Sequence, residues 1–130
     1  MDALTDPRLA GAEAEFEQAM QHLRDGSEKD IEDAIDEAAK SVEGAMKVLL
    51  DAHGVDLTGK ETAWPLFGVL TKSVIVEAEA ENAVLGAARV RNEWGGHGAG
   101  ASPRATPPGL AELAVHGAAS AVTYLASRLP

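Results

Sequence analysis

Apolar residues recur every three or four positions along most of this chain, which is the spacing of helices that bury one face. The first such segment begins after Asp6, a good capping residue, and Pro7, which is common at the first position of a helix. Gly26 follows as a stop signal. The sequence therefore predicts a first helix between Pro7 and Gly26.

A second helix is predicted from Ser27 to about His53, and it is the most clearly amphipathic segment of the chain. Ser27 and Asp30 form a box-like helix start, and Gly54 is a stop signal. The stripe that this helix is expected to bury consists of Ile31, Ile35, Ala38, Val42, Met46 and Leu49.

Three further helices are predicted over residues 63–72, 76–94 and 109–128. The helix over 76–94 has a stripe formed by Ala78, Val84, Leu85, Ala88 and Arg91. Apolar residues surround most of the last helix, with Leu110, Ala114, Ala118, Ala121 and Leu125 on one side and Leu113, Gly117 and Tyr124 on another. A helix that is apolar nearly all round is buried on more than one side, so its second side can face another subunit.

Residues 95–109 form a Gly- and Pro-rich stretch that suits neither a helix nor a strand. Four glycines fall between positions 95 and 100, and three prolines follow by position 108. A connection of roughly fifteen residues is long for a compact domain, and such loops are usually functional or disordered.

Composition favours an all-α fold, because the apolar fraction of 45% is rich in alanine and aromatic residues make up only 4% of the chain. A chain of 130 residues has the size of one domain. We expect a compact bundle of four to five helices with a long Gly/Pro loop before the last one. No segment approaches the ~18 apolar residues of a membrane span, and there is no cysteine. These features favour a cytoplasmic protein without a membrane partner or a thiolate metal site.

Acidic residues are concentrated in the first half of the chain. Residues 1–61 contain sixteen acidic and six basic residues, a net charge of −10, whereas residues 62–130 contain five of each. This charge opposes nonspecific nucleic-acid binding and favours a basic protein partner. Residues 82–109 are the exception, because three arginines outnumber the single acid, Glu93.

The strongest candidates for chemistry are Arg91, Asn92 and His97, at the end of a predicted helix and in the loop after it. A histidine with a pKa near 6.5 can take a proton from a ribose 2′-hydroxyl, which makes that hydroxyl a nucleophile on the adjacent phosphate. Arg91 can stabilise the charge of the pentacoordinate transition state, and Asn92 can orient either group. RNA cleavage of this kind needs no metal or other cofactor.

Ordinary structural roles explain the same residues. A cation in the last turn of a helix interacts favourably with the helix dipole, Asn is common at helix ends, and a histidine among glycines is usually solvated. Glu43 and Lys47 have the spacing of a surface ion pair, unless the second helix packs against the loop and they line the site. Trp94 is expected to be a hydrophobic plug at the helix end, and the alternative is a ring on which an RNA base stacks. Spacing alone leaves both interpretations open.

Several functional classes lack their motifs. The four histidines, His22, His53, His97 and His116, show no paired metal-ligand spacing. No phosphate-binding P-loop, dinucleotide-binding glycine motif or esterase nucleophile motif occurs. The charge balance and the absence of a basic recognition helix argue against helix-turn-helix DNA binding.

Two segments, IEDAIDEAAKSVEGAMKVLLDAHG and LGAARVRNEWGGHG, together resemble the abortive-infection-protein-like C-terminal domain of bacterial and phage proteins. That domain is related to the HEPN superfamily of helical bundles. The shared pattern is an amphipathic helix, an Arg-Asn helix end and a His-Gly in the loop that follows. The resemblance covers about residues 28–128, so we expect an N-terminal helix over 1–26 and a HEPN-like domain over 27–130.

The resemblance implies defence against phage. Family members in which four to six residues separate an arginine from a histidine act as metal-independent ribonucleases, typically as dimers with a composite site. Arg91 and His97, with five residues between them, match that element, and Asn92 matches the polar residue after the arginine. The family thus implies a homodimer that cleaves RNA. Some relatives are noncatalytic, so the alternative is a dimerisation or partner-binding module of the antitoxin or sensor-coupling kind.

Overall fold

The computed structural model describes residues 6–94 and 105–130, and within these ranges every regular element is helical. The expected all-α fold is confirmed, with six α-helices rather than four to five. In chain order the elements are η2 (Pro7–Leu9), α1 (Ala10–Asp25), α2 (Glu28–Ala52), α3 (Ala63–Lys72), η3 (Ala78–Ala80), α4 (Glu81–Val84), α5 (Gly86–Trp94) and α6 (Pro108–Ala126), where η marks a 3₁₀ turn.

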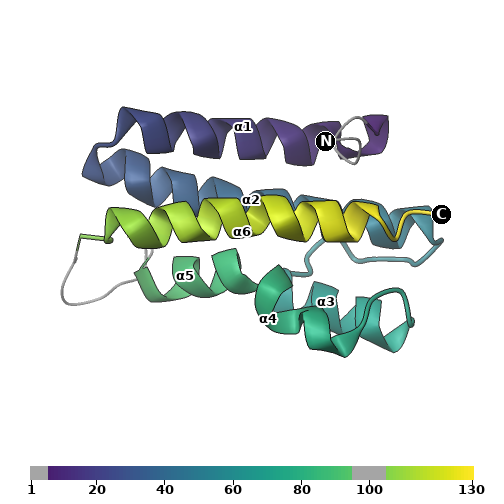
Figure 1. Ribbon diagram of the computed structural model, residues 1–130. Coiled ribbons are helices and arrows are strands. Elements are labelled where there is room, and N and C mark those ends of the chain that lie inside the picture. The colour runs from purple at the N-terminus through teal and green to yellow at the C-terminus, as the bar shows by residue number, and fades with distance from the viewer. Residues whose placement is uncertain (1–5, 95–104) are drawn as a thin grey trace.

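The long helix α2 lies at the centre of the bundle and packs against α1, α3, α5 and α6. Figure 1 shows α1 along one side of the molecule, α5 along the opposite side, and α2 and α6 between them. The helices α2 and α6 run in the same direction, whereas α1 and α5 run antiparallel to them. This arrangement presents the end of α5, which carries Arg91 and Asn92, to the central helix.

The turn between α1 and α2 has the predicted signals. Gly26 ends α1 in the left-handed conformation with φ +78°, which a residue without Cβ adopts without strain. Ser27 then caps α2: its hydroxyl accepts a hydrogen bond from the backbone N–H of Asp30, and the Asp30 carboxylate accepts one from the N–H of Ser27. The predicted capping box is confirmed.

The core is built on the predicted stripe of α2, all of whose residues from Ile31 to Leu49 are buried. Alanines fill much of the space against α1 and α6, as the composition suggested. One polar group is buried between α1 and α2: the Ser41 hydroxyl donates a 2.8 Å hydrogen bond to the carbonyl oxygen of Ala12. That bond satisfies the hydroxyl and links the two helices.

The expectation of one continuous helix over 76–94 is wrong, because the chain forms η3, α4 and α5 there. The backbone N–H of Glu77 donates to the Tyr124 hydroxyl at 3.2 Å instead of entering a helix, and Ala78 is exposed. Leu85 then departs from helical geometry at φ −92° and ψ 8°, directly before Gly86, a residue with low helix propensity. Contacts with α6 therefore override the local periodicity.

The last helix, α6, begins at Pro108 and ends at Ala126, close to the predicted bounds. Four residues of its first predicted stripe, Ala114, Ala118, Ala121 and Leu125, are buried. Leu113, on the second side, has 67% of its surface exposed. None of the helices in residues 6–94 and 105–130 is long and apolar enough to cross a membrane.

Candidate functional site

Arg91 lies in the last turn of α5 and is joined to the central helix. Its Nη2 atom donates a 2.6 Å hydrogen bond to Oε1 of Glu43 on α2, and both side chains are 16% exposed. The predicted surface pair of Glu43 with Lys47 is wrong, since Lys47 makes no ion pair with any residue in the described ranges. The packing of α5 on α2 gives Glu43 a partner in a less solvated place, where a charge-assisted bond is stronger.

Small residues position Arg91 against α2. Ala87 and Ala88 are each 4% exposed, and they precede Arg91 by four and three residues. Positions three and four apart share one face of a helix, so the face of α5 that carries these alanines also carries Arg91. Because alanine side chains are short, the two helices approach closely and the guanidinium reaches Glu43.

The geometry of this pair suits phosphate binding. A guanidinium has five N–H donors, and the bond to Glu43 uses the nitrogen Nη2. Glu43 can therefore hold the side chain in one orientation while other donors of the fork bind phosphate oxygens. Partial removal from water strengthens the electrostatic interaction with such an anion. The position in the last helical turn is also favourable for a cation.

The other two candidate residues are not brought to this pair within the described residues. Asn92 is exposed and makes no polar contact with another residue in the described ranges. His97 lies outside the described residues. Trp94, expected as a hydrophobic plug, is half-buried at the end of α5.

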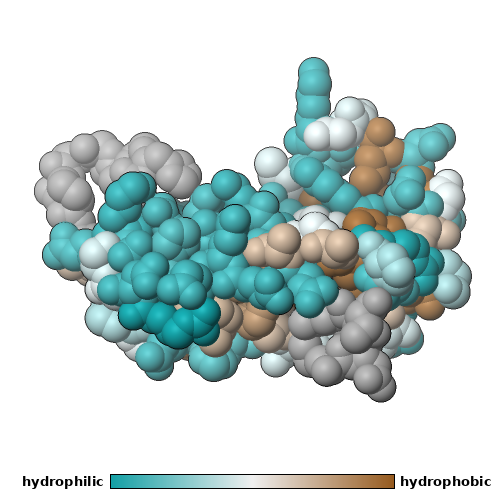
Figure 2. Space-filling view, turned by 90° about the horizontal axis from the view of Figure 1, so that it is seen from above, coloured by the Kyte–Doolittle hydropathy of each residue, from teal (hydrophilic) through white to brown (hydrophobic). Residues whose placement is uncertain are grey.

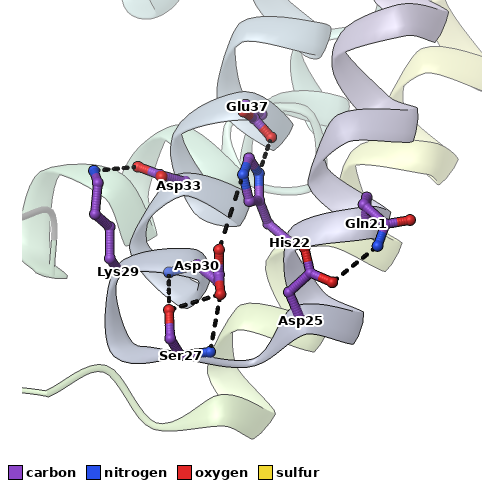
Figure 3. Close-up of polar contacts among 8 residues, drawn as sticks. All are labelled: Gln21, His22, Asp25, Ser27, Lys29, Asp30, Asp33 and Glu37. Atoms are coloured by element: carbon purple, nitrogen blue, oxygen red, sulfur yellow. Dashed lines mark hydrogen bonds and ion pairs between the residues drawn. The ribbon is translucent and has the colours of Figure 1, made fainter.

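Another polar cluster, at the turn between α1 and α2, was missed by the sequence analysis (Figure 3). His22 Nδ1 lies 2.7 Å from Oε2 of Glu37, and His22 Nε2 lies 4.0 Å from Oδ1 of Asp30. The hydrogen bond with Glu37 raises the pKa of His22 above its usual value, and the nearby carboxylates act in the same direction. The capping box around Asp30 gave the only sequence signal, since fifteen positions separate His22 from Glu37.

The contact between His22 on α1 and Glu37 on α2 joins these two helices, so the cluster is a structural link. Residues 6–94 and 105–130 contain no group of three or more His, Asp or Glu side chains arranged to hold a metal ion. The sequence led us to expect RNA cleavage without a metal ion. Among the described residues, the Arg91–Glu43 pair best matches that chemistry.

Comparison with protein families decides which kind of bundle this is. A family model described as Abi_C, HEPN-like domain, matches residues 10–129. The chain belongs to the Abi_C family of HEPN-like domains. Membership supports an abortive-infection or HEPN-family role. The match includes α1, and the expected division of the chain at residue 26 stays a prediction. No curated protein and no solved structure gives a match.

On this HEPN-like domain an apolar groove of about 370 Å³ lies between α6 and the α4–α5 segment, which we call the α5/α6 groove. Its lining is mostly small and apolar, and it consists of Asn82, Ala83, Gly86, Ala87, Arg89, Val90, Leu113, Ala114, Gly117 and Ser120. Arg89, the one charged residue of that lining, lies 5.6 Å from the centre of the Trp64 ring. Val90, another lining residue, directly precedes Arg91.

Proposed function

We propose that this HEPN-like protein is a metal-independent endoribonuclease of abortive infection, with Arg91, Asn92 and His97 as its site at a homodimer interface. The observation that carries the proposal is Arg91 itself, a half-buried cation held 2.6 Å from Glu43 in the last turn of α5. Only five residues separate it from His97 in the sequence.

The chemistry assigns one task to each group. His97 takes the proton of a ribose 2′-hydroxyl, and the resulting oxygen attacks the adjacent phosphorus. Arg91 binds the nonbridging oxygens, which gain charge in the transition state. The bond from phosphorus to the 5′-oxygen breaks and that oxygen takes a proton from solvent water, so the products are a 2′,3′-cyclic phosphate and a 5′-hydroxyl. Asn92, which is exposed, is available to contact the RNA near the scissile bond.

Glu43 acts as a positioning residue in this proposal. It lies on α2, the most deeply packed helix, so its bond restrains the guanidinium of Arg91 to one orientation. Preorganised donors are effective because they need no rearrangement as charge develops. Loss of the Glu43 carboxylate is expected to lower the cleavage rate less than loss of Arg91, because the cation remains.

The test is incubation of purified protein with single-stranded RNA in EDTA, with the product ends determined. Arg91→Ala is expected to lower the rate by about 10²–10³-fold and His97→Ala by about 10²–10⁴-fold. Arg91→Lys keeps the charge and loses the fork, so it should retain only part of the activity. RNA with a 2′-deoxyribose at the cleaved position should remain intact.

Matched controls lie away from the site. Arg24 on α1 is exposed and bonds to Gln21, and His53 at the end of α2 bonds to the carbonyl oxygen of Arg128. Arg24→Ala and His53→Ala should cleave like the wild type. Equal cleavage by folded wild type, Arg91→Ala and His97→Ala would rule out the mechanism.

A noncatalytic dimerisation or partner-binding module is the second candidate. The observation in its favour is that Arg91 already has an intramolecular partner, as a structural arginine would. This candidate predicts that purified protein leaves RNA intact and that Glu43→Gln lowers stability by about 1–2 kcal/mol, since a half-buried cation loses its counter-charge. The RNA assay separates the two candidates, because the Glu43–Arg91 bond and its contribution to stability belong to both.

A further inference from the structure

Lys47 is a cation that the proposed mechanism does not use, and it lies one helical turn from Glu43 on α2. The chain has five lysines, and four of them are exposed, whereas Lys47 is half-buried. Among the exposed ones, Lys29 and Lys40 each pair with an aspartate four positions away. Lys47 is therefore the least solvated lysine of the chain.

Lys47 has no counter-charge, although two carboxylates have the spacing to supply one. Glu43 precedes it by four residues and Asp51 follows it by four, and neither forms an ion pair with it. Glu43 is bound to Arg91 instead. No other residue in 6–94 and 105–130 pairs with Lys47. A partly buried ammonium without a partner raises the free energy of the folded chain, and a bound anion offsets part of that increase.

The packing of α5 on α2 places Lys47 near Arg91. The two helices run antiparallel (Figure 1), so the turn of α2 that follows Glu43 lies against the turn of α5 that precedes Arg91. That turn of α5 carries Ala87 and Ala88, which are buried and bring no charge. Side chains of a helix lean toward its N-terminus, so the stem of Lys47 lies over the turn that carries Glu43. The guanidinium and the ammonium are therefore neighbouring cations.

The spacing of these two cations suits consecutive phosphates of an RNA strand. Glu43 and Lys47 are about 6 Å apart along the axis of α2, because each residue of a helix advances by about 1.5 Å. Neighbouring phosphates of a nucleic-acid strand have a similar separation. The guanidinium of Arg91, held at Glu43, can bind one phosphate, and an ammonium one turn further along α2 can bind the next.

Charge elsewhere on the surface favours this place for an anionic strand. Residues 1–61 carry a net charge of −10, and Figure 2, which looks onto the α1 side, shows a mostly hydrophilic face. Helix α5 lies on the opposite side of the molecule (Figure 1). Its other arginine, Arg89, lies over the ring of Trp64. Phosphates are repelled least on the α5 side, where Lys47 is the cation without a partner.

We propose that Lys47 is a second phosphate-binding cation of this site and that it binds the phosphate next to the scissile one. The inference rests on the proposed function, in which Arg91 binds the scissile phosphate, and it names the substrate class more closely. A dinucleotide has a single phosphate and cannot use both cations, so the site prefers a longer strand. An ammonium binds phosphate as a point charge, so Lys47 adds affinity without selecting a base.

Binding of single-stranded RNA tests the proposal on the full chain, with a strand that is 2′-O-methylated throughout and so cannot be cleaved. Lys47→Met keeps the aliphatic stem and removes the ammonium, so it should raise the dissociation constant about fivefold at low salt. The fall of log affinity with log salt concentration should become shallower by about 0.7, the value for one phosphate contact on a single strand. The loss should be equal for RNAs of different sequence.

Lys72→Met is the matched control, because it removes the same charge from an exposed lysine at the end of α3, far from the Arg91 end of α5 (Figure 1). It should bind RNA like the wild type. Lys47→Arg keeps a cation on a long stem and should bind within about twofold of the wild type. Lys47→Met loses no ion pair, so urea unfolding should show at least the stability of the wild type. Binding by Lys47→Met that is as tight as binding by Lys72→Met overturns the proposal.

Cleavage of unmodified RNA by the same variants separates failure of this inference from failure of the proposed function. In a cleaving protein, Lys47→Met should act mainly through KM. Binding that depends on Lys47 in a protein that does not cleave supports the phosphate contact and removes the ribonuclease. Cleavage with the same KM in Lys47→Met and Lys72→Met overturns the role of Lys47 and leaves the Arg91 chemistry in place. A wild type that does not bind RNA overturns both.

Discussion

Two hydrogen-bonded ion pairs with little exposure tie α2 to its neighbours, and they differ in their response to pH. Arg91 bonds to Glu43 with both side chains 16% exposed, and an arginine keeps its charge at every physiological pH. His22 bonds to Glu37, with side-chain exposures of 27% and 14%, and a histidine titrates near neutrality. The first pair is therefore permanent, and the second is a pH-dependent contribution to stability.

The His22–Glu37 pair gives a prediction about stability and pH. The pKa of His22 is raised in the folded chain, chiefly by its hydrogen bond with Glu37, above the value of 6.5 expected for the unfolded chain. The stabilisation is then fully present below the unfolded pKa and is lost as the pH rises through the folded pKa. His22→Gln should cost more stability at about pH 5.5 than at about pH 9.

Urea unfolding of both proteins at the two pH values measures this difference. His116→Gln is the control, because His116 is exposed on α6 and makes no polar contact within the described ranges. This variant removes no polar contact within the described ranges, so its stability should stay close to that of the wild type. A cost of His22→Gln that is independent of pH, or larger at high pH, would contradict the prediction.

The candidate site could be predicted only in part at this scale. Arg91 was found because a residue type and a helix end are both visible in the sequence. The sequence pairs Glu43 with Lys47, because their i, i+4 spacing is local. The contact that Glu43 makes in the structure is with Arg91, 48 positions away, and no local spacing indicates it. Sequence spacing identifies which side chains can do chemistry, and packing decides which carboxylate they contact.

At the scale of elements, glycines at different backbone conformations should respond in opposite ways to the same substitution. Gly44 lies within α2, and an added Cβ meets no atom within 4 Å, so Gly44→Ala should raise the free energy of unfolding by about 0.5–1 kcal/mol. Gly26 has φ +78°, a conformation that strains alanine, so Gly26→Ala should lower the free energy of unfolding by about 1–2 kcal/mol. Denaturant unfolding followed by helical circular dichroism measures both.

Double substitution is the control for this pair. Gly26 and Gly44 do not contact each other, so the two effects should add. A stabilising Gly26→Ala would mean that the α1–α2 turn does not need the left-handed conformation.

The bounds of a helix could be predicted where residues within that helix determine them. The periodic stripe and the capping box placed α2, and the bounds of the short helix α3 were predicted correctly as 63–72. The prediction of one continuous helix over 76–94 was wrong because the local pattern there is helical, whereas the hydrogen bond between Glu77 and Tyr124 draws the chain out of the helix. Tyr124 is 47 positions away, and no local periodicity contains that contact.

At the scale of the molecule, charge and apolar surface are segregated. The acidic half contains α1 and α2, and the near-neutral half contains α5 and α6, which stand on either side of the groove. Segregation of this kind leaves one side of the molecule that repels other acidic molecules and another side with little net charge.

Salt should therefore act in opposite directions on the two proposed interactions. Two chains with a charge of −10 each repel one another, so screening of that charge should strengthen the proposed self-association between about 50 mM and about 500 mM NaCl. RNA binding through Arg91 releases counterions from the phosphates, so its affinity should fall over the same range.

Sedimentation and RNA binding measured across one salt series test both halves of this prediction. Self-association that weakens as salt is added would mean that ion pairs across the interface outweigh apolar contact. In that case the contact between the two copies would have to lie where their charges are complementary.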